Sequence, residues 1–165
     1  MRVLLVGGGC RGLQLTRSLV ADGHAVRVVT RDAGRRAAIE DAGGECWIGD
    51  PDVVGTLRYA LESVTILVWA LGTAAGTAEQ VAALHGPRLQ MMLSKVVDTT
   101  VRGVVYEAAG TIAPAAFASG IGELERMGRL NEIPVAVVDA DPADGAGWAR
   151  AVRLAIGGLI GMGYD

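Results

Sequence analysis

The chain has 165 residues, 51% of them apolar, with a net charge of −3 and a mean hydropathy of +0.37. A chain of this length forms one domain with a core of its own, and its negative charge gives no support for a nucleic-acid partner. Two distant cysteines, no signal-peptide core and no apolar stretch of about 18 residues argue against a disulfide framework, a metal site and a membrane span, so we expect a reduced, cytoplasmic protein.

The chain opens with a short apolar strand, Val3–Val6, followed at once by a glycine-rich turn. Its glycines have the spacing G-x-G-x-x-G, and a helical pattern follows them, which is the context of a dinucleotide-binding fingerprint. Gly7 permits the tight turn, Gly9 lets the backbone approach a pyrophosphate, and Gly12 lets the helix pack closely on the strand. The phosphates would then face free N–H groups at the positive end of the helix. The alternative is a glycine-rich turn that binds nothing.

The second predicted strand, Ala25–Val29, runs into Thr30 and Arg31. A domain that selects NAD usually carries an acidic residue there, which accepts hydrogen bonds from the ribose hydroxyls. Arginine instead suits the 2′-phosphate of NADP and can stack on adenine. Arg11, in the glycine turn, adds a second positive charge within reach of that phosphate. Asp32 either caps the next helix or, as a ribose ligand, favours NAD. Taken together, these residues favour NADP over NAD.

The rest of the chain continues to alternate apolar strands and helices, which predicts a parallel sheet covered on both faces. Asp52 is expected to cap the third helix, and Pro87 to divide the helical region 77–99. At least one of Arg35 and Arg36 is expected on a solvated helix face. Right-handed crossovers then give one doubly wound α/β domain, a Rossmann fold over residues 1–165 with strand order 3-2-1-4-5-6. The remaining predicted strands are Glu45–Ile48, Thr65–Ala70, Gly103–Tyr106 and Pro134–Val138.

The chain resembles the atypical and extended short-chain dehydrogenases/reductases, NAD(P)-binding proteins related to sugar-nucleotide epimerases. Besides the glycine turn, residues 23–32 are similar to the family's second strand, and Gly49 with Asp50 resembles its adenine-contacting Gly-Asp pair. Leu71-Gly72 resembles the small-residue turn beside the cofactor, and residues 101–106 resemble the run before the catalytic serine. The resemblance covers nearly the whole chain and implies a dinucleotide partner.

The glycine turn and this resemblance together name the candidate cofactor-binding residues. Cys10 belongs to them as a small residue that fits beside a pyrophosphate; the alternative is a thiolate stabilised at a helix N-terminus. His85 falls near the family's fourth-helix asparagine, or is an ordinary polar residue at a helix break. The candidates are Gly7, Gly9, Cys10, Arg11, Gly12, Thr30, Arg31, Asp50, Ala70, Leu71 and Gly72.

The chain departs from the family where the chemistry takes place. Ala108, Ala109 and Gly110 stand where the family carries Ser or Thr after the fifth strand. No Tyr-x-x-x-Lys pair exists, and the single lysine, Lys95, lies in another helix. The family's tyrosine general acid is therefore missing. Glu107 is the acid nearest the expected nicotinamide ring and is the candidate catalytic residue. Alternatively, it pairs with a local backbone N–H or with an arginine.

Two functions agree with these residues. The first is an NADP-binding protein of the atypical reductase type, an oxidoreductase that positions the cofactor and takes a proton from water or Glu107 while reducing an unknown small molecule. The second is a non-catalytic module that senses the redox state of a dinucleotide and acts on a protein partner, which the missing tyrosine and lysine favour. A weaker likeness is to regulatory nucleotide-binding domains of potassium transport systems, which keep an acidic residue where this chain has none.

A twofold homodimer is also expected. The family's usual dimer packs its fourth and fifth helices against those of the partner, and the fourth helix here is more apolar than one side of a sheet requires. Methionines on such a face suit an adaptable interface, and the last helix is a second candidate face. The alternative is that both helices only cover the sheet. The apolar residues concerned are Leu84, Leu89, Met91, Met92, Leu93, Val96 and Val97, and then Leu154, Ile156, Leu159 and Ile160.

Overall fold

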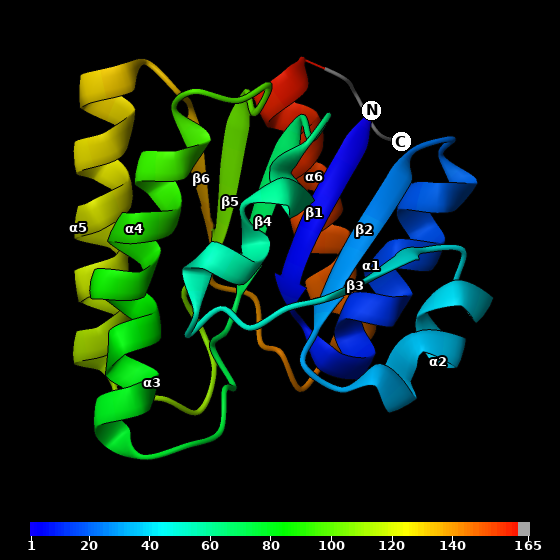
Figure 1. Ribbon diagram of the computed structural model, residues 1–165, viewed down its shortest axis with the longest axis horizontal. Helices are drawn as coiled ribbons and strands as arrows, with labels where there is room; N and C mark the ends of the chain where they lie inside the picture. The colour runs from blue at the N-terminus through cyan, green and yellow to red at the C-terminus, as the bar shows by residue number, and fades with distance from the viewer. Residues whose placement is uncertain (162–165) are drawn as a thin grey trace.

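The computed structural model describes residues 1–161 and contains one sheet of six parallel strands (Figure 1). The strand order is β3-β2-β1-β4-β5-β6, so the predicted doubly wound fold is confirmed. The strands are all parallel, and in Figure 1 β1, β2, β4, β5 and β6 run downward while β3 crosses obliquely from the right, so their carboxyl ends share one edge of the sheet. The strands are β1 (Arg2–Gly7), β2 (Ala25–Thr30), β3 (Glu45–Ile48), β4 (Ile66–Ala70), β5 (Gly103–Glu107) and β6 (Val135–Val138).

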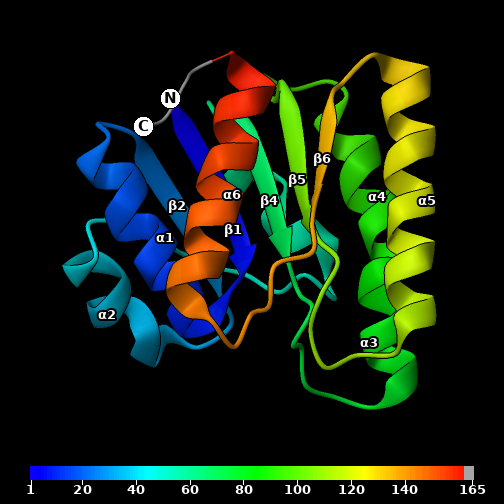
Figure 2. The ribbon, with the colours of Figure 1, turned by 180° about the vertical axis from the view of Figure 1, so that it is seen from behind.

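Helices cover both faces of the sheet, as Figure 1 and the reverse view in Figure 2 show. One face carries α1 (Gly9–Ala21), α2 (Arg36–Asp41) and α6 (Gly145–Ile160). The other carries α3 (Ala78–His85), α4 (Pro87–Val96) and α5 (Pro114–Asn131), with the short 3-10 turns η2 (Val54–Leu57) and η3 (Tyr59–Leu61). No helix among residues 1–161 combines the length and apolar character needed to cross a membrane.

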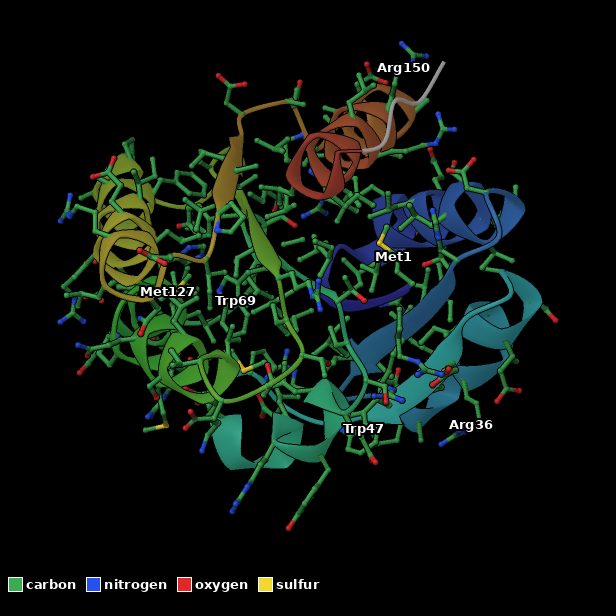
Figure 3. The ribbon with its side chains drawn as sticks, turned by 90° about the horizontal axis from the view of Figure 1, so that it is seen from above. Met1, Arg36, Trp47, Trp69, Met127 and Arg150 are labelled. Carbon is green, nitrogen blue, oxygen red and sulfur yellow. The ribbon has the colours of Figure 1, made fainter. Side chains whose placement is uncertain are left out.

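The apolar strands supply both layers of the core. Side chains alternate along β1, so that Leu4 belongs to the layer that contains η2, η3, α4 and α5, whereas Val3 and Leu5 belong to the layer that contains α1 and α6. A strand buried on both faces is apolar at every position, which explains the unbroken apolar runs. Figure 3 shows Trp69 of β4 inside the core layer beneath α4 and α5, on the side of the sheet where Met127 of α5 lies.

The break between α3 and α4 is the predicted one. α3 begins at a capping box in which Thr77 accepts a hydrogen bond from the N–H of Gln80 and the side chain of Gln80 accepts one from the N–H of Thr77. It ends at His85, and Pro87 opens α4 as its first residue. Proline is tolerated there because the first N–H of a helix has no partner within the helix.

Two predicted caps have different outcomes. Asp32 caps the 3-10 turn η1 (Ala33–Arg35) that leads into α2, and accepts a 2.8 Å hydrogen bond from the N–H of Gly34. The prediction that Asp52 caps the third helix is wrong: only η2 and η3 lie between it and β4, the N-cap of η2 is Val53, and the Asp52 carboxylate accepts a 3.0 Å hydrogen bond from Arg88 Nε in α4. This ion pair joins segments 36 residues apart, which a local capping argument does not consider.

Candidate nucleotide-binding site

The glycine turn joins β1 to α1 through three left-handed residues. Gly7, Gly8 and Gly9 have φ angles of +88°, +91° and +53°. A Cβ on Gly7 would collide with the carbonyl oxygen of Ala70, to which the N–H of Gly8 donates a 3.0 Å hydrogen bond. A Cβ on Gly12 would lie 3.1 Å from Leu5 Cδ2. The turn is thus closed on two sides, as the glycine spacing predicts.

Gly9 differs from Gly7 and Gly12 because the space where its side chain would lie is open. No heavy atom lies within 4 Å of a Cβ built on it, and it begins α1, where the first N–H groups have no acceptor within the helix. Cys10 follows it and is exposed. An anion placed over Gly9 would meet free N–H groups and the positive end of the helix dipole.

A cavity of about 330 Å³ lies beside this turn, at the carboxyl ends of β1, β2 and β3. Its floor is Gly7, and its walls come from the ends of β2 and β3, the turn after β4 and helix α3. Arg31 is exposed there and forms no ion pair with any other residue in the range 1–161. The wall residues are Val29, Thr30, Arg31, Asp32, Arg35, Gly49, Asp50, Pro51, Asp52, Leu71, Ala74, Ala75, Gln80 and Leu84.

The two arginines after Asp32 lie in different environments. Arg35 borders the cavity. Arg36 pairs with Glu40 one turn further along α2, at 3.7 Å, with both side chains about half exposed. Figure 3 shows Arg36 at the edge of the molecule. Arg36 is therefore the arginine on a solvated helix face.

Arg11 lies elsewhere than predicted. Its Nε and Nη2 donate to Glu107 Oε2 and Oε1 at 3.0 and 2.7 Å, and its Nη1 donates to Thr73 Oγ1 at 3.2 Å. Its guanidinium also stacks over the ring of Trp148, 5.0 Å from the centroid. Because β5 and β2 lie on opposite sides of β1, this pairing points Arg11 away from Arg31. The prediction that both arginines reach one phosphate is wrong for the structure as it stands.

Glu107 adopts the alternative that the sequence offered for it. Besides the two bonds from Arg11, its Oε1 accepts a 2.6 Å hydrogen bond from the N–H of Gly72. The side chains of Arg11 and Glu107 are only 9% and 1% exposed. Glu107 thus pairs with both an arginine and a backbone N–H, and both of its oxygens are occupied.

The turns after β4 and β5 meet backbone to backbone beside this ion pair. The N–H of Thr111 donates a 3.0 Å hydrogen bond to the carbonyl of Gly72. A Cβ on Gly72 would collide with the carbonyl of Ala109, and one on Gly110, where φ is +150°, with the carbonyl of Gly72. Both backbone polar groups of Gly72 are therefore used within the protein, and Gly72 does not line the cavity.

The candidate cofactor residues fall into three groups. Those lining the cavity are Gly7, Thr30, Arg31, Asp50 and Leu71. Those at the open start of α1 are Gly9 and Cys10. Those used in internal contacts are Arg11, Gly12, Ala70 and Gly72. Contact of the first two groups with a dinucleotide stays a prediction.

A buried pair that the sequence did not reveal supports the turn after β4. His85 Nδ1 lies 2.6 Å from the hydroxyl of Tyr106, and its Nε2 lies 3.1 Å from the carbonyl oxygen of Leu71. Because a carbonyl only accepts, Nε2 carries the proton and Nδ1 accepts from Tyr106. Burial lowers the pKa of His85 and raises that of Tyr106. The residues lie 21 positions apart, so no local pattern links them.

Acid is expected to destabilise the fold through His85. Because burial lowers its folded-state pKa, the unfolded chain takes up the proton first below about pH 6.5, and stability falls with pH there. The loss reaches at most about 1.4 kcal/mol per pH unit and is absent above about pH 7.5. Burial also lowers the pKa of His24, so the share of His85 is the difference between wild type and His85→Gln in urea unfolding at about pH 7.5 and about pH 5.5. His85→Gln keeps a donor and an acceptor without titrating, so an unchanged slope in this variant would contradict the assignment.

Two of the tyrosines expected to lack a catalytic partner, Tyr59 and Tyr106, do not line the cavity. Tyr59 is exposed in η3, and Tyr106 is buried against His85. Lys95 lies near the end of α4. Tyr164 lies outside the described residues.

A second hollow of about 450 Å³, between the ends of β5 and β6, is lined by Thr73, Ala109, Gly110, Thr111, Asp139, Asp141, Pro142 and Ala143.

Comparison with solved structures confirms the fold. BdcA from E. coli is 18% identical, with a TM-score of 0.72 over 93% of this chain and 89% of that one. UDP-glucose 4-epimerase from Thermotoga maritima is 15% identical (TM-score 0.69, 83% of this chain, 54% of that one). A short-chain dehydrogenase/reductase superfamily protein from Agrobacterium tumefaciens with bound NAD is 15% identical (TM-score 0.68, 83% and 48%).

These similarities agree with the resemblance seen in the sequence at the level of the fold. The chain spans about half the length of the epimerases and of the Agrobacterium protein. No protein-family model matches the sequence, and no curated protein matches it significantly.

Proposed function

We propose that the protein binds a nicotinamide dinucleotide at the carboxyl edge of its sheet, where the strand order reverses between β1 and β4. The observation that carries this proposal is the open space over Gly9 at the start of α1, directly beside the cavity floored by Gly7. Solved proteins of the same fold, an epimerase among them, contain NAD. A relationship to the short-chain reductases and epimerases is part of the proposal.

We further propose that NADP binds more tightly than NAD. Arg31 and Arg35 both border the cavity at the end of β2. Of the acids beside them, Asp52 is paired with Arg88, and Asp32 is engaged as a cap. Neither arginine has an ion-pair partner among residues 1–161, so both can bind a 2′-phosphate in the cavity, and Arg binds phosphate through its planar fork of donors.

Titration with both dinucleotides tests this preference. A charge-assisted hydrogen bond contributes about 1.5–3 kcal/mol, so Arg31→Ala should narrow the gap between NADP and NAD by at least about tenfold. Arg36→Ala is the matched control, because Arg36 is an exposed arginine on the same segment that pairs with Glu40 and should leave the gap unchanged. Equal affinities in the wild type, or tighter binding of NAD, would refute the preference.

The contacts of Glu107 favour a binding module over a reductase. Its two oxygens already accept three hydrogen bonds, from Arg11 and from the N–H of Gly72, so they hold the fold together instead of facing a substrate. Tyr106 is likewise buried and bonded. We propose a non-catalytic regulatory module that binds the dinucleotide and acts on a protein partner, with oxidoreductase activity on a small molecule as the alternative. Oxidation of NADPH by a broad set of carbonyl compounds, with turnover well above a Gly9→Leu control, would support the alternative.

A homodimer through α4 and α5 is proposed as well. Most of the apolar side chains of α4 cover the sheet, but Met91 and Val97 are 44% and 39% exposed. Together with Leu130 of α5, which is 73% exposed, they line a groove of about 510 Å³ between the two helices. On α6, Leu154 is exposed whereas Ile156 is buried. Light scattering at micromolar concentration should give twice the 17.0 kDa mass of one chain; a mass of one chain would refute the dimer.

We assign the protein to the cytoplasm. Cys10 and Cys46, the only cysteines of the sequence, are both free thiols. Free thiols are typical of a reducing compartment. Fractionation of cells that produce the full chain tests this assignment, which recovery from a membrane or secreted fraction would overturn.

A further inference from the structure

We propose that this protein recognises its ligand through the adenosine half alone, so that adenine mononucleotides carrying a 2′-phosphate bind about as tightly as the complete dinucleotide. The inference rests on the proposed nucleotide site and goes further by naming the part of the ligand that the site takes. It follows from the contrast between the two halves of the carboxyl edge of the sheet.

The adenosine half of the edge is open. A doubly wound sheet consists of two mononucleotide-binding halves, the first being β1 to β3 and the second β4 to β6. The cavity of about 330 Å³ belongs to the first half, since its walls come from the ends of β2 and β3 and it reaches β4 only through the turn at Leu71. Ligand pockets begin at about 300 Å³, so the cavity suits one nucleoside with its phosphate.

The second half is closed by the ion pair at the end of β5. Arg11 reaches from the first turn of α1, across the end of β4, to both oxygens of Glu107. It stacks on Trp148 of α6 and bonds to Thr73 on the way. The nicotinamide half of a dinucleotide would have to pass between α1 and the turns after β4 and β5, which is the space that the guanidinium fills.

The turn after β4 reinforces this closure. Gly72 gives its N–H to Glu107 and its carbonyl to the N–H of Thr111, and side chains on Gly72 or Gly110 would collide with the facing backbone. The N–H of Gly72 is therefore not available to a ligand. The hollow beyond the turn, bordered by Asp139 and Asp141, shares no lining residue with the cavity.

Opening the second half would separate a buried ion pair. Arg11 and Glu107 are almost completely excluded from water, so a ligand that drew Arg11 away would leave Glu107 as an uncompensated buried charge. A nicotinamide ring and its ribose offer no carboxylate to replace Glu107. Nicotinamide contacts therefore add little net affinity, and the adenosine half determines binding.

The first experiment is a ligand series titrated into the wild-type protein by calorimetry: NADP, 2′,5′-ADP and nicotinamide mononucleotide. We expect the dissociation constants of 2′,5′-ADP and NADP to agree within about threefold, and nicotinamide mononucleotide not to bind at about 1 mM. NADP binding at least about tenfold more tightly than 2′,5′-ADP would overturn the inference while leaving the proposed function intact. Binding of neither adenine nucleotide would overturn the proposed function itself.

The second experiment changes Arg11→Ala and Glu107→Gln together, which removes the guanidinium from the space beside Trp148 and leaves neither charge alone. The ratio of the affinities for NADP and 2′,5′-ADP should then rise at least about tenfold in favour of NADP. The control changes Asp22→Asn and Arg153→Ala, an ion pair that joins the end of α1 to α6 outside both hollows, and should leave the ratio unchanged. An unchanged ratio in the folded Arg11/Glu107 variant would show that the ion pair is not the barrier; the wild-type series decides the inference if that variant does not fold.

Discussion

Replacing Glu107 by glutamine while Arg11 stays in place is expected to lower the free energy of unfolding by about 3–5 kcal/mol, the usual cost of removing one partner of a buried ion pair. Glu107 accepts hydrogen bonds at both oxygens, whereas a glutamine has one acceptor oxygen and an NH₂ group that would face a donor. The guanidinium of Arg11, only 9% exposed, would be left without a countercharge. Urea unfolding followed by circular dichroism measures the loss.

A matched pair of controls isolates the burial of this ion pair. Glu45→Gln removes a carboxylate that also bonds to two arginines, Arg2 and Arg27, but is 44% exposed, so its loss should cost less than about 1 kcal/mol. Adding Arg11→Met to Glu107→Gln should restore part of the stability, because no buried charge then stays unpaired. Equal effects at Glu107 and Glu45 would show that the Arg11–Glu107 contact does not carry the stability assigned to it.

Alanine at Gly7 is expected to destabilise the fold severely, whereas alanine at Gly9 is expected to be tolerated. The added Cβ at Gly7 collides with the carbonyl of Ala70 at φ +88°, and strain together with overpacking costs roughly 3 kcal/mol or more. The added Cβ at Gly9 meets nothing within 4 Å, so only the left-handed backbone costs about 1–2 kcal/mol. Thermal and urea unfolding of the two variants give the comparison.

Nucleotide binding, unlike stability, should depend on the open space over Gly9. Gly9→Leu places a large side chain in the open space over the start of α1 and is expected to abolish binding of NADP while the domain stays folded. Gly23→Leu is the control, since Gly23 is also left-handed, with φ +87° and nothing within 4 Å of a built Cβ, but follows the far end of α1. Undiminished binding by folded Gly9→Leu would mean that the pyrophosphate does not lie over the glycine turn.

The sequence by itself determined the sheet. Every strand was predicted to within two residues of its observed bounds, because a strand buried on both faces must be apolar throughout and a crossover connection must separate it from the next parallel strand. The roles of Gly7 and Gly12 in the turn could also be predicted, since close backbone contacts admit no side chain. The break between α3 and α4 at Pro87 could be predicted too, because proline has no N–H for the middle of a helix. These are local constraints, and each one restricts the type of residue at the position where it acts.

Tertiary structure alone decided which polar side chains meet. Arg11 and Glu107 are 96 residues apart and Asp52 and Arg88 are 36 apart; nothing near either partner in the chain identifies the other. Arg11 was expected beside Arg31 because both occur next to cofactor motifs, yet the order of the strands puts Glu107 within its reach on the opposite side of β1. A buried guanidinium requires a countercharge, and only the folded sheet determines which carboxylate supplies it. That choice leaves the adenosine half of the edge open and closes the other half.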